Sequence, residues 1–139
     1  MNPAAILYPV IALAVLTFIV LLLIPYQRAK ALILKQMVID DLKFGESKNV
    51  PVGVSIPNRN YMNLLELPIL FYVVCLTMFV THTVTSVAVG LAWGYVASRA
   101  VHSLVHLTYN KVWHRLAAFV LSNFFLLALW GLLTLNLSK

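Results

Sequence analysis

Charged residues and cysteines are scarce in this chain of 139 residues. Only 10% of the residues are charged, whereas about a quarter are charged in an ordinary soluble domain. The single cysteine, Cys75, excludes an intrachain disulfide, a thiolate metal site and a redox pair. Four acidic residues stand against ten lysines and arginines, so the net charge is +6. So little charge argues against a soluble globular domain.

Apolar residues are correspondingly abundant. They make up 62% of the chain, and the mean hydropathy is +0.92. This composition predicts an integral membrane protein, and the length suffices for four helical spans of about 20 residues each. We therefore expect an all-α fold, a single membrane domain built as a four-helix bundle. The expected spans cover about 3–26, 58–80, 84–107 and 115–137, with cytoplasmic connections at about 28–57 and 108–114.

The first apolar run predicts a span that is retained in the protein. Residues 1–5 lack the basic region of a signal peptide, and the run is too long for a cleaved hydrophobic segment. From Arg28 to about Leu42 a helical pattern continues among charged residues, so we expect the first helix to extend past the membrane. Residues 45–57 are rich in glycine, proline and asparagine, which indicates a loop.

Positive charge is distributed unevenly among the connections. The stretch from Arg28 to Arg59 holds six lysines and arginines, and Lys111 lies between Arg99 and Arg115, whereas residues 81–86 hold none. Basic connections stay in the cytoplasm, so both termini are expected on the opposite side. Topology and anionic headgroups explain the basic excess without nucleic acid. A compact chain without a retrieval signal favours a bacterial inner membrane.

Three polar residues open the second apolar segment at helical spacing. Arg59, Asn63 and Glu66 stand at i, i+4 and i+7, so a helix places them on one face. A carboxylate inside a span is costly unless a cation or hydrogen-bond donors meet it. The triplet therefore indicates one wall of a polar site. A structural ion pair of Glu66 with Arg59 or Arg99 is the alternative.

A second polar face ends the third span. Arg99, His102, His106 and Tyr109 stand at i, i+3, i+7 and i+10. Together with the first triplet they would form a basic pocket for a small polyanion that arrives from the cytoplasm. Anchoring of the arginines to headgroups is the simpler alternative. The histidine pair has the spacing of metal ligands, but only His114 or Glu66 could complete it, so we predict no metal.

The order of these motifs resembles the MAPEG family, the membrane-associated proteins in eicosanoid and glutathione metabolism. The resemblance covers essentially the whole chain. It is carried by the following pattern: Arg59-x3-Asn63-x2-Glu66-x-Pro68, then Arg99-x2-His102, then Arg115. The resemblance implies a homotrimer, with glutathione bound in clefts between subunits near the cytoplasmic face.

The resemblance also implies a role for each residue. Arg59, Asn63 and Glu66 would hold the charged ends of the tripeptide, and Arg99 and His102 would complete that wall. His106 and Tyr109 follow on the same face as further candidate ligand-binding residues. A basic residue at the end of the first span would join them, either Arg28 or Lys30. Arg115 would lie beside the sulfur as the catalytic group.

The implied chemistry is a glutathione-dependent transferase or peroxidase reaction. A free thiol has a pKa of about 8.5, and a neighbouring guanidinium favours the nucleophilic thiolate. Glutathione would be the co-substrate, and the second substrate would be a lipophilic electrophile or lipid in the bilayer.

Two positions depart from the family pattern. His106 stands where eukaryotic members often have tyrosine, and Ile56 stands where several members have an arginine. A related thiol or another anionic amphiphile is therefore an alternative ligand. A non-catalytic lipid-binding or scaffold protein on the same fold is an alternative function. A small multidrug exporter also has four spans and one intramembrane carboxylate, but there the acid is not accompanied by arginines.

Overall fold

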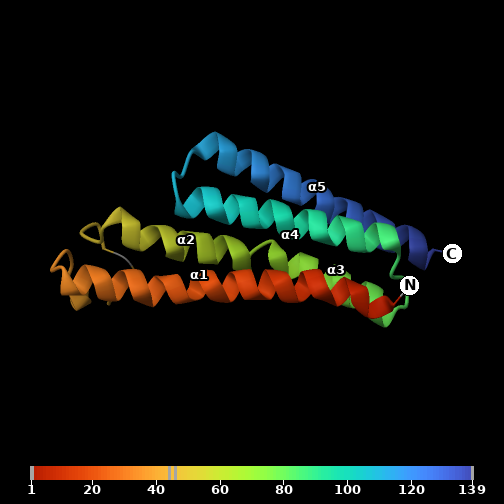
Figure 1. Cartoon of the computed structure of the whole chain (residues 1–139), viewed down its shortest axis with the longest axis horizontal. Coiled ribbons are helices and arrows are strands. Elements are labelled where there is room, and N and C mark those ends of the chain that lie inside the picture. Colours follow the sequence, from red (N-terminus) through yellow and green to blue (C-terminus); the bar gives the residue numbers. More distant parts are fainter. Residues whose placement is uncertain (1, 44, 46, 139) are drawn as a thin grey trace.

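A computed structural model describes residues 2–43, 45 and 47–138. Every named element in these residues is helical, which confirms the all-α fold. The elements, shown in Figure 1, are the 3-10 helix η1 (Pro3–Ile6), α1 (Leu7–Ile33), the 3-10 helix η2 (Ile39–Leu42), α2 (Val52–Leu65), α3 (Pro68–Val80), α4 (Ser86–Leu107) and α5 (Val112–Leu137).

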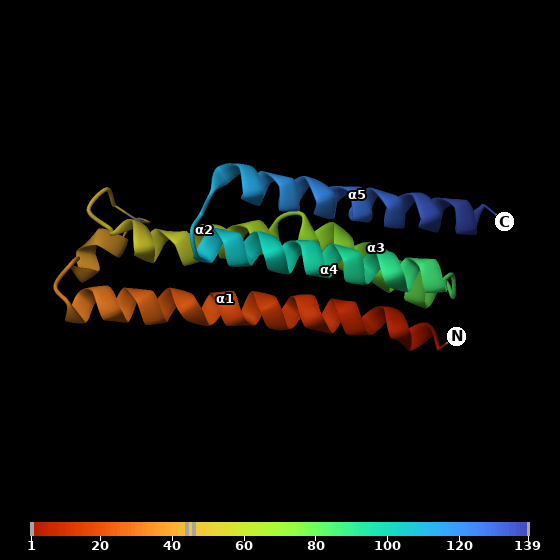
Figure 2. The same ribbon diagram turned by 45° about the horizontal axis from the view of Figure 1, so that its top comes forward.

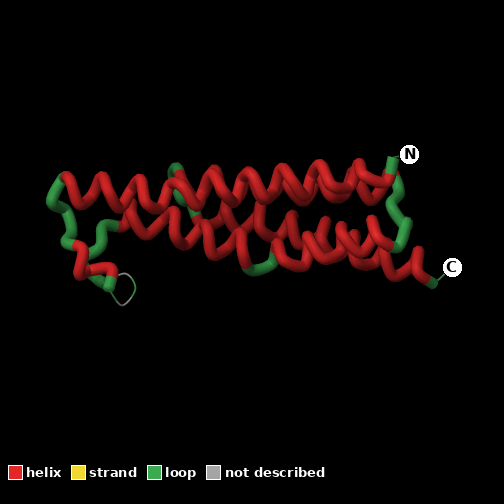
Figure 3. The backbone as a smooth tube through the Cα atoms, turned by 90° about the horizontal axis from the view of Figure 1, so that it is seen from below, coloured by secondary structure: helices red, strands yellow, loops and turns green. Residues whose placement is uncertain are grey.

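The helices form an elongated bundle. The helix α1 lies along one side, α2, α3 and α4 lie in the middle, and α5 lies on the other side (Figures 1 and 2). Both termini are at one end, and the α1–α2 connection is at the other (Figure 3). We call this second end, with the turns at residues 34–51 and 108–111, the basic end. There α1 and α2 reach beyond α4 and α5 (Figures 1 and 2).

Among the described residues, three helical stretches are long and apolar enough to cross a membrane. They are Pro3–Ile33, Val52–Val80 and Val112–Leu137. The first contains 31 residues, which at 1.5 Å per residue exceeds the roughly 30 Å of bilayer hydrocarbon. The helix α4 has 22 residues and is the most polar of the long helices, because its second half contains an arginine and two histidines.

A proline divides the second long helical stretch, Val52–Val80, into α2 and α3. Pro68 has no backbone N–H and its ring crowds the carbonyl of Leu64, so the helix cannot continue through it. The break falls at Glu66, whose φ of −76° and ψ of −94° are not helical. Glu66 therefore follows the last residue of α2 instead of continuing its regular face beyond Asn63.

The connection between α1 and α2 differs from the expected pattern. The helix α1 ends at Ile33, and Lys35 has a φ of 52°, so the helical pattern read through Leu42 is realised only as the short η2. The helix α2 begins at Val52 within the expected loop, because Pro51 occupies its N-cap. Pro57 lies inside α2, where the carbonyl it leaves unpaired belongs to Gly53.

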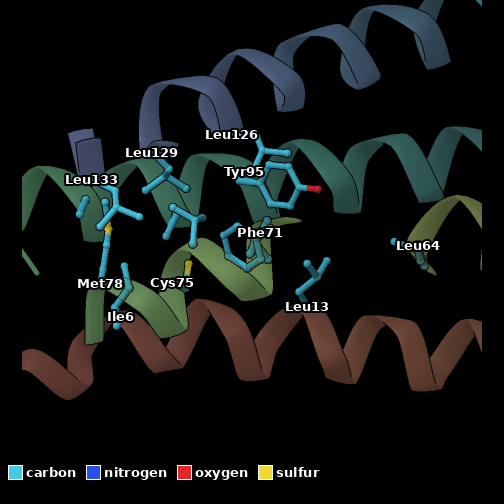
Figure 4. Close-up of a cluster of buried hydrophobic side chains, with 14 of the residues drawn as sticks. Ile6, Leu13, Leu64, Phe71, Cys75, Met78, Tyr95, Leu126, Leu129 and Leu133 are labelled. Carbon is cyan, nitrogen blue, oxygen red and sulfur yellow. The ribbon is translucent and has the colours of Figure 1, made fainter. Parts of the chain in front are cut away.

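An apolar core fills the half of the bundle that contains the termini. Figure 4 shows its side chains, which come from η1, α1, α3, α4 and α5, with Leu64 added from the end of α2. The rings of Phe71 and Tyr95 stack there with centroids 4.5 Å apart. Close approach of α4 and α5 depends on Gly94, because a Cβ at that position would lie 2.7 Å from the Phe125 ring. Small residues allow such approaches between membrane helices.

Candidate functional site

The polar half of α4 is buried in the bundle. Arg99, His102 and His106 are each less than 5% exposed. Their spacing brings them to one helical face, as the sequence predicts. That face points toward α2 and α5 because its hydrogen bonds run to both helices. The polar pattern of α4 is therefore an inward-facing feature.

Arg99 ties α4 to the end of α2. Its Nη2 donates to the backbone oxygen of Asn63 at 2.8 Å. That carbonyl belongs to the last turn of α2, where helical carbonyls lack a donor within the helix. The guanidinium carbon also lies 5.4 Å from the centre of the Phe119 ring, a cation–π distance. The carboxylate of Glu66 attracts this guanidinium electrostatically, and no hydrogen bond joins the two among the described residues.

Arg115 lies in the first turns of α5 and is held from two sides. Its Nη1 donates to Asn110 Oδ1 at 2.8 Å and lies 3.3 Å from His106 Nε2. Its backbone oxygen lies 3.2 Å from His102 Nδ1. The side chain and the main chain of Arg115 are therefore both fixed by residues at the end of α4.

The turn between α4 and α5 sets the position of Asn110. Its φ of 47° is in the left-handed region, which asparagine tolerates better than most residues. Its backbone N–H donates to the oxygen of Val105 at 2.8 Å and closes the end of α4. This geometry brings the Asn110 side chain against Arg115.

Two hollows meet at Arg115. The first, which we call the basic hollow, has a volume of about 400 Å³. It is lined by Ser47, Lys48, Val50, Val52, Ser55, Ile56, Arg59, His106, Asn110 and Arg115. The second, which we call the mixed hollow, has a volume of about 230 Å³. It is lined by Asn63, His102, Val112, Arg115, Leu116 and Phe119.

The charges of the basic hollow are all positive among the described residues. Lys48, Arg59 and Arg115 line it together with hydroxyl and amide groups, and no described carboxylate does. Its size falls within the roughly 300–1,000 Å³ typical of small-molecule sites. The mixed hollow adds the apolar side chains of Leu116 and Phe119. The pair can therefore accept an anionic molecule with an apolar neighbour.

Several buried polar atoms beside the hollows have no hydrogen-bond partner among the described residues. Asn60, whose Oδ1 accepts from the Ser103 hydroxyl at 3.2 Å, is fully buried. The unpartnered atoms near it are Asn60 Nδ2, Arg99 Nε, Arg99 Nη1, His102 Nε2 and His106 Nδ1. A buried polar atom without a partner costs about 1–3 kcal/mol. Such atoms indicate that water or a ligand belongs here.

The structure brings five of the predicted site residues to these hollows. They are Arg59, Asn63, His102, His106 and Arg115. Arg99 lies behind them, buried against Phe119 and Asn63. These six residues come from α2, α4 and α5.

The other predicted residues lie elsewhere in the single chain. Glu66 is exposed at the break after α2 and lines neither hollow. The Tyr109 hydroxyl bonds His114 Nδ1 at 2.9 Å, and both residues line a different hollow between α4 and α5. Arg28 is half-buried on α1, and Lys30 lines a small hollow between α1 and the start of α2. Neither Arg28 nor Lys30 lines the basic or the mixed hollow.

Sequence reasoning missed the contribution of the connections. Lys48 and Ser55 line the basic hollow although they belong to the stretch read as a loop, and Asn110 fixes Arg115. Phe119, one turn after Arg115, lines the mixed hollow although its place within an apolar span did not mark it as a site residue. Spacing from Arg115 could have found Phe119, since residues at i and i+4 share a helix face. Nothing in the spacing relates Lys48 to Arg59.

The metal interpretation of the histidines finds no third ligand in the structure. In the part of the chain that is described, no three His, Cys, Asp or Glu residues are grouped so as to hold a metal ion. His114 is exposed and turned toward Tyr109. His102 and His106 are instead bonded to Arg115.

Comparison with known proteins places the chain in a family. The profile of the MAPEG family matches residues 6–135, which is nearly the whole chain. No curated protein and no solved structure matches it. The match includes α2, α4, α5 and the connections that together line both hollows. The chain therefore belongs to the MAPEG family.

Proposed function

We propose that this protein is a glutathione-dependent transferase or peroxidase that acts on lipophilic electrophiles in the membrane. The observation that carries the proposal is the position of Arg115, which lines both the basic hollow and the mixed hollow. A thiol tripeptide in the first hollow and an apolar electrophile in the second would meet at this guanidinium. Family membership supports the proposal, since the family includes glutathione transferases.

The charges support an anionic thiol as the ligand. Glutathione has two carboxylates and one ammonium group, and Lys48 and Arg59 provide cations for the carboxylates. Guanidinium groups bind carboxylates with paired, charge-assisted hydrogen bonds. Asn63 and His102 add polar groups at the entrance to the mixed hollow.

The reaction follows from the position of Arg115. The thiol loses its proton to water, and the guanidinium stabilises the thiolate that remains. The sulfur electron pair then attacks the electrophilic carbon, a carbon–sulfur bond forms, and the leaving group departs with its bonding electrons. With a hydroperoxide the thiolate attacks the terminal oxygen, the oxygen–oxygen bond breaks, and the alkoxide takes a proton from water and leaves as an alcohol. The sulfenic acid formed then reacts with a second thiol, which gives a disulfide and releases water. Arg115 acts as an electrostatic stabiliser in both cases.

We propose further that three copies assemble in the membrane and complete the site. In the single chain Arg59 and Glu66 are exposed, and neither Arg28 nor Lys30 reaches the hollows. A neighbouring copy that supplied the end of α1 would bring one of these cations to the cleft. The basic connections favour the cytoplasmic side for this cleft, and a bacterial inner membrane is the proposed location.

The test is the purified protein in detergent or lipid with glutathione and an aryl halide. We expect Arg115→Ala to lower kcat about 100-fold or more while glutathione binding falls less, because the guanidinium acts mainly on the thiolate. Lys111→Ala removes a cation four residues away that lines neither hollow, so it is the matched control. Conjugation at the wild-type rate by Arg115→Ala would remove the assigned role.

A second candidate function is binding of an anionic lipid without turnover. It is favoured by the wall of Val50, Val52 and Ile56 in the basic hollow, which suits an amphiphile as well as a tripeptide. Calorimetry with glutathione and with a short-chain anionic lipid separates the two functions. Binding of the lipid together with no binding of any thiol would establish the second function in place of the first.

A further inference from the structure

We infer that His106 is a positioning residue whose neutral imidazole aims Arg115 into the two hollows, so that protonation of His106 releases Arg115. This inference deepens the proposed function and rests on it for the kinetic test. It concerns the position where the family resemblance leads one to expect tyrosine. The atoms of Arg115, His102 and His106 differ in whether they can donate or accept a hydrogen bond, and this difference fixes the tautomer of each ring.

The two hydrogens of Arg115 Nη1 are both engaged. One donates to Asn110 Oδ1 at 2.8 Å, and the other points to His106 Nε2 at 3.3 Å. A guanidinium only donates hydrogen bonds, so the imidazole nitrogen that it meets must carry a lone pair. The proton of the neutral His106 ring is therefore on Nδ1.

The remaining donors of Arg115 are left for a ligand. Arginine has five N–H donors, and Nε and Nη2 carry the three that make no hydrogen bond among the described residues. Because Arg115 lines both hollows, this free edge of the guanidinium is available where the hollows meet. Holding Nη1 fixes the plane of the group and hence the direction of the other donors.

His102 holds the main chain of the same residue. The backbone oxygen of Arg115 can only accept, so His102 Nδ1 is the donor in the 3.2 Å contact. Two histidines one turn apart on α4 thus fix Arg115 by different atoms, His102 through the carbonyl and His106 through the guanidinium. Only the second bond requires an unprotonated nitrogen toward Arg115.

Protonation of His106 would replace its hydrogen bond with Arg115 by repulsion between two cations. An imidazolium has hydrogen on both nitrogens, so Nε2 would then present a proton to the Nη1 donors. Among the described residues, the charged and titratable groups that line the hollow or adjoin His106 on α4 are cationic or neutral, namely Arg59 on α2, Arg115 on α5, Lys48 in the connection, and Arg99 and His102 on α4. In the described connection, the carboxylate of Asp41 is bonded to Ser47. No described carboxylate lines the basic hollow to compensate the added charge. The guanidinium would swing away, and catalysis would fall in acid.

The kinetic test compares two substitutions with different chemistry. His106→Gln keeps an oxygen that can accept from Arg115 but does not titrate, whereas His106→Phe keeps the ring volume and removes the acceptor. At neutral pH we expect His106→Phe to lower kcat about tenfold or more with little change in KM, and His106→Gln to stay within about threefold of wild type. The fall of kcat in acid should be lost in His106→Gln. His114→Gln, on an exposed histidine next to Arg115, should keep the wild-type profile.

Three kinetic results would overturn the inference, the third being a rise in KM alone. One is an acid limb that persists in His106→Gln, since the titrating group would then be elsewhere. Another is an equal loss of kcat in His106→Gln and His106→Phe, since the acceptor would then be irrelevant. A rise in KM alone in both variants would show that His106 contacts the ligand instead.

A readout without turnover separates this inference from the proposed function. Nitrogen NMR of the histidine-labelled protein reports the ring tautomer, and we expect His106 to carry its proton on Nδ1 in wild type and to lose that preference in Arg115→Ala. If His106 shows this tautomer but the protein does not turn over glutathione, the proposed function is wrong and the Arg115–His106 contact still stands. The opposite tautomer in wild type would overturn the inference whatever the activity.

Discussion

The two halves of α4 show how one helix serves two purposes. Its first half buries Ala88, Ala92 and Tyr95 in the apolar core, where α4 and α5 approach closely at Gly94. Its second half buries Arg99, His102 and His106, beside hollows and unpartnered polar atoms. We call the part of the bundle around the first half, which packs as an apolar core, the closed half, and the part around the second half, which lies beside the two hollows, the open half.

The comparison separates the part of the bundle that provides stability from the part that holds the candidate site. Lipid is as apolar as a leucine side chain, so helices in a membrane associate through close contacts and hydrogen bonds. The core half provides those contacts. The polar half buries groups that cost free energy without a ligand, and such local inconsistencies are expected at functional sites.

The largest predicted effect on stability is in the closed half. Phe71→Ala removes a fully buried ring stacked on Tyr95, and we expect it to lower the free energy of unfolding by about 3–5 kcal/mol. Thermal unfolding in detergent measures it, with the exposed Leu76→Ala as control. Glutathione affinity of the folded fraction should be unchanged. A weaker affinity with intact stability would break the division between the halves.

The next largest effect is in the open half, where we expect ligand affinity to fall while stability changes little. Arg99→Met removes a buried guanidinium that holds the Asn63 carbonyl. The Asn63 carbonyl loses its donor, but the buried and unpartnered Arg99 Nε and Nη1 are removed as well, so the two effects offset and thermal unfolding of the ligand-free protein should change little. Glutathione affinity should fall about tenfold, because Asn63 lines the mixed hollow. A large loss of thermal stability would show that Arg99 is mainly structural.

A smaller effect tests the boundary between α4 and α5. Gly94→Ala would place a Cβ 2.7 Å from the Phe125 ring, so the ring must shift, and we expect a loss of about 1 kcal/mol. Unfolding of Gly94→Ala with and without Phe125→Leu measures the coupling, because the smaller side chain should relieve part of the loss. Additive losses in the double variant would contradict the contact.

The smallest effect is in the α1–α2 connection, part of which lines the basic hollow. The Asp41 carboxylate accepts from the backbone N–H of Val38 and from Ser47 and Asn49, and these bonds hold its pKa below the ordinary value, with the Val38 bond contributing most. A lowered pKa means that the turn is fully stabilised above the ordinary carboxyl pKa and loosens as pH falls through the lowered value. Asp41→Asn should speed amide hydrogen exchange at Val38, Ser47 and Asn49 near neutral pH, because a neutral amide accepts these bonds less strongly than a carboxylate.

Sequence reasoning reached most of the bundle because membranes restrict the available structures. Only helices satisfy every backbone group within hydrocarbon when no barrel is formed, so long apolar runs predict helices directly. The periodic placement of Arg99, His102 and His106 on one face followed from helix geometry alone. The connection between α1 and α2 was less predictable, because turn residues such as Pro51 and Pro57 are compatible with the start of a helix as well as with a loop.

Composition and periodicity are local properties of the chain, and from the sequence alone they identify a helical membrane protein with a basic polar face on α4. The MAPEG family was indicated by the resemblance of the motif order and is shown by the family profile. Only the tertiary structure decided that Arg115 is held by His102, His106 and Asn110, and that Lys48 faces the same hollow as Arg59. These relations depend on how α5 and the connections pack against α4, and contacts between distant segments are not written in local spacing.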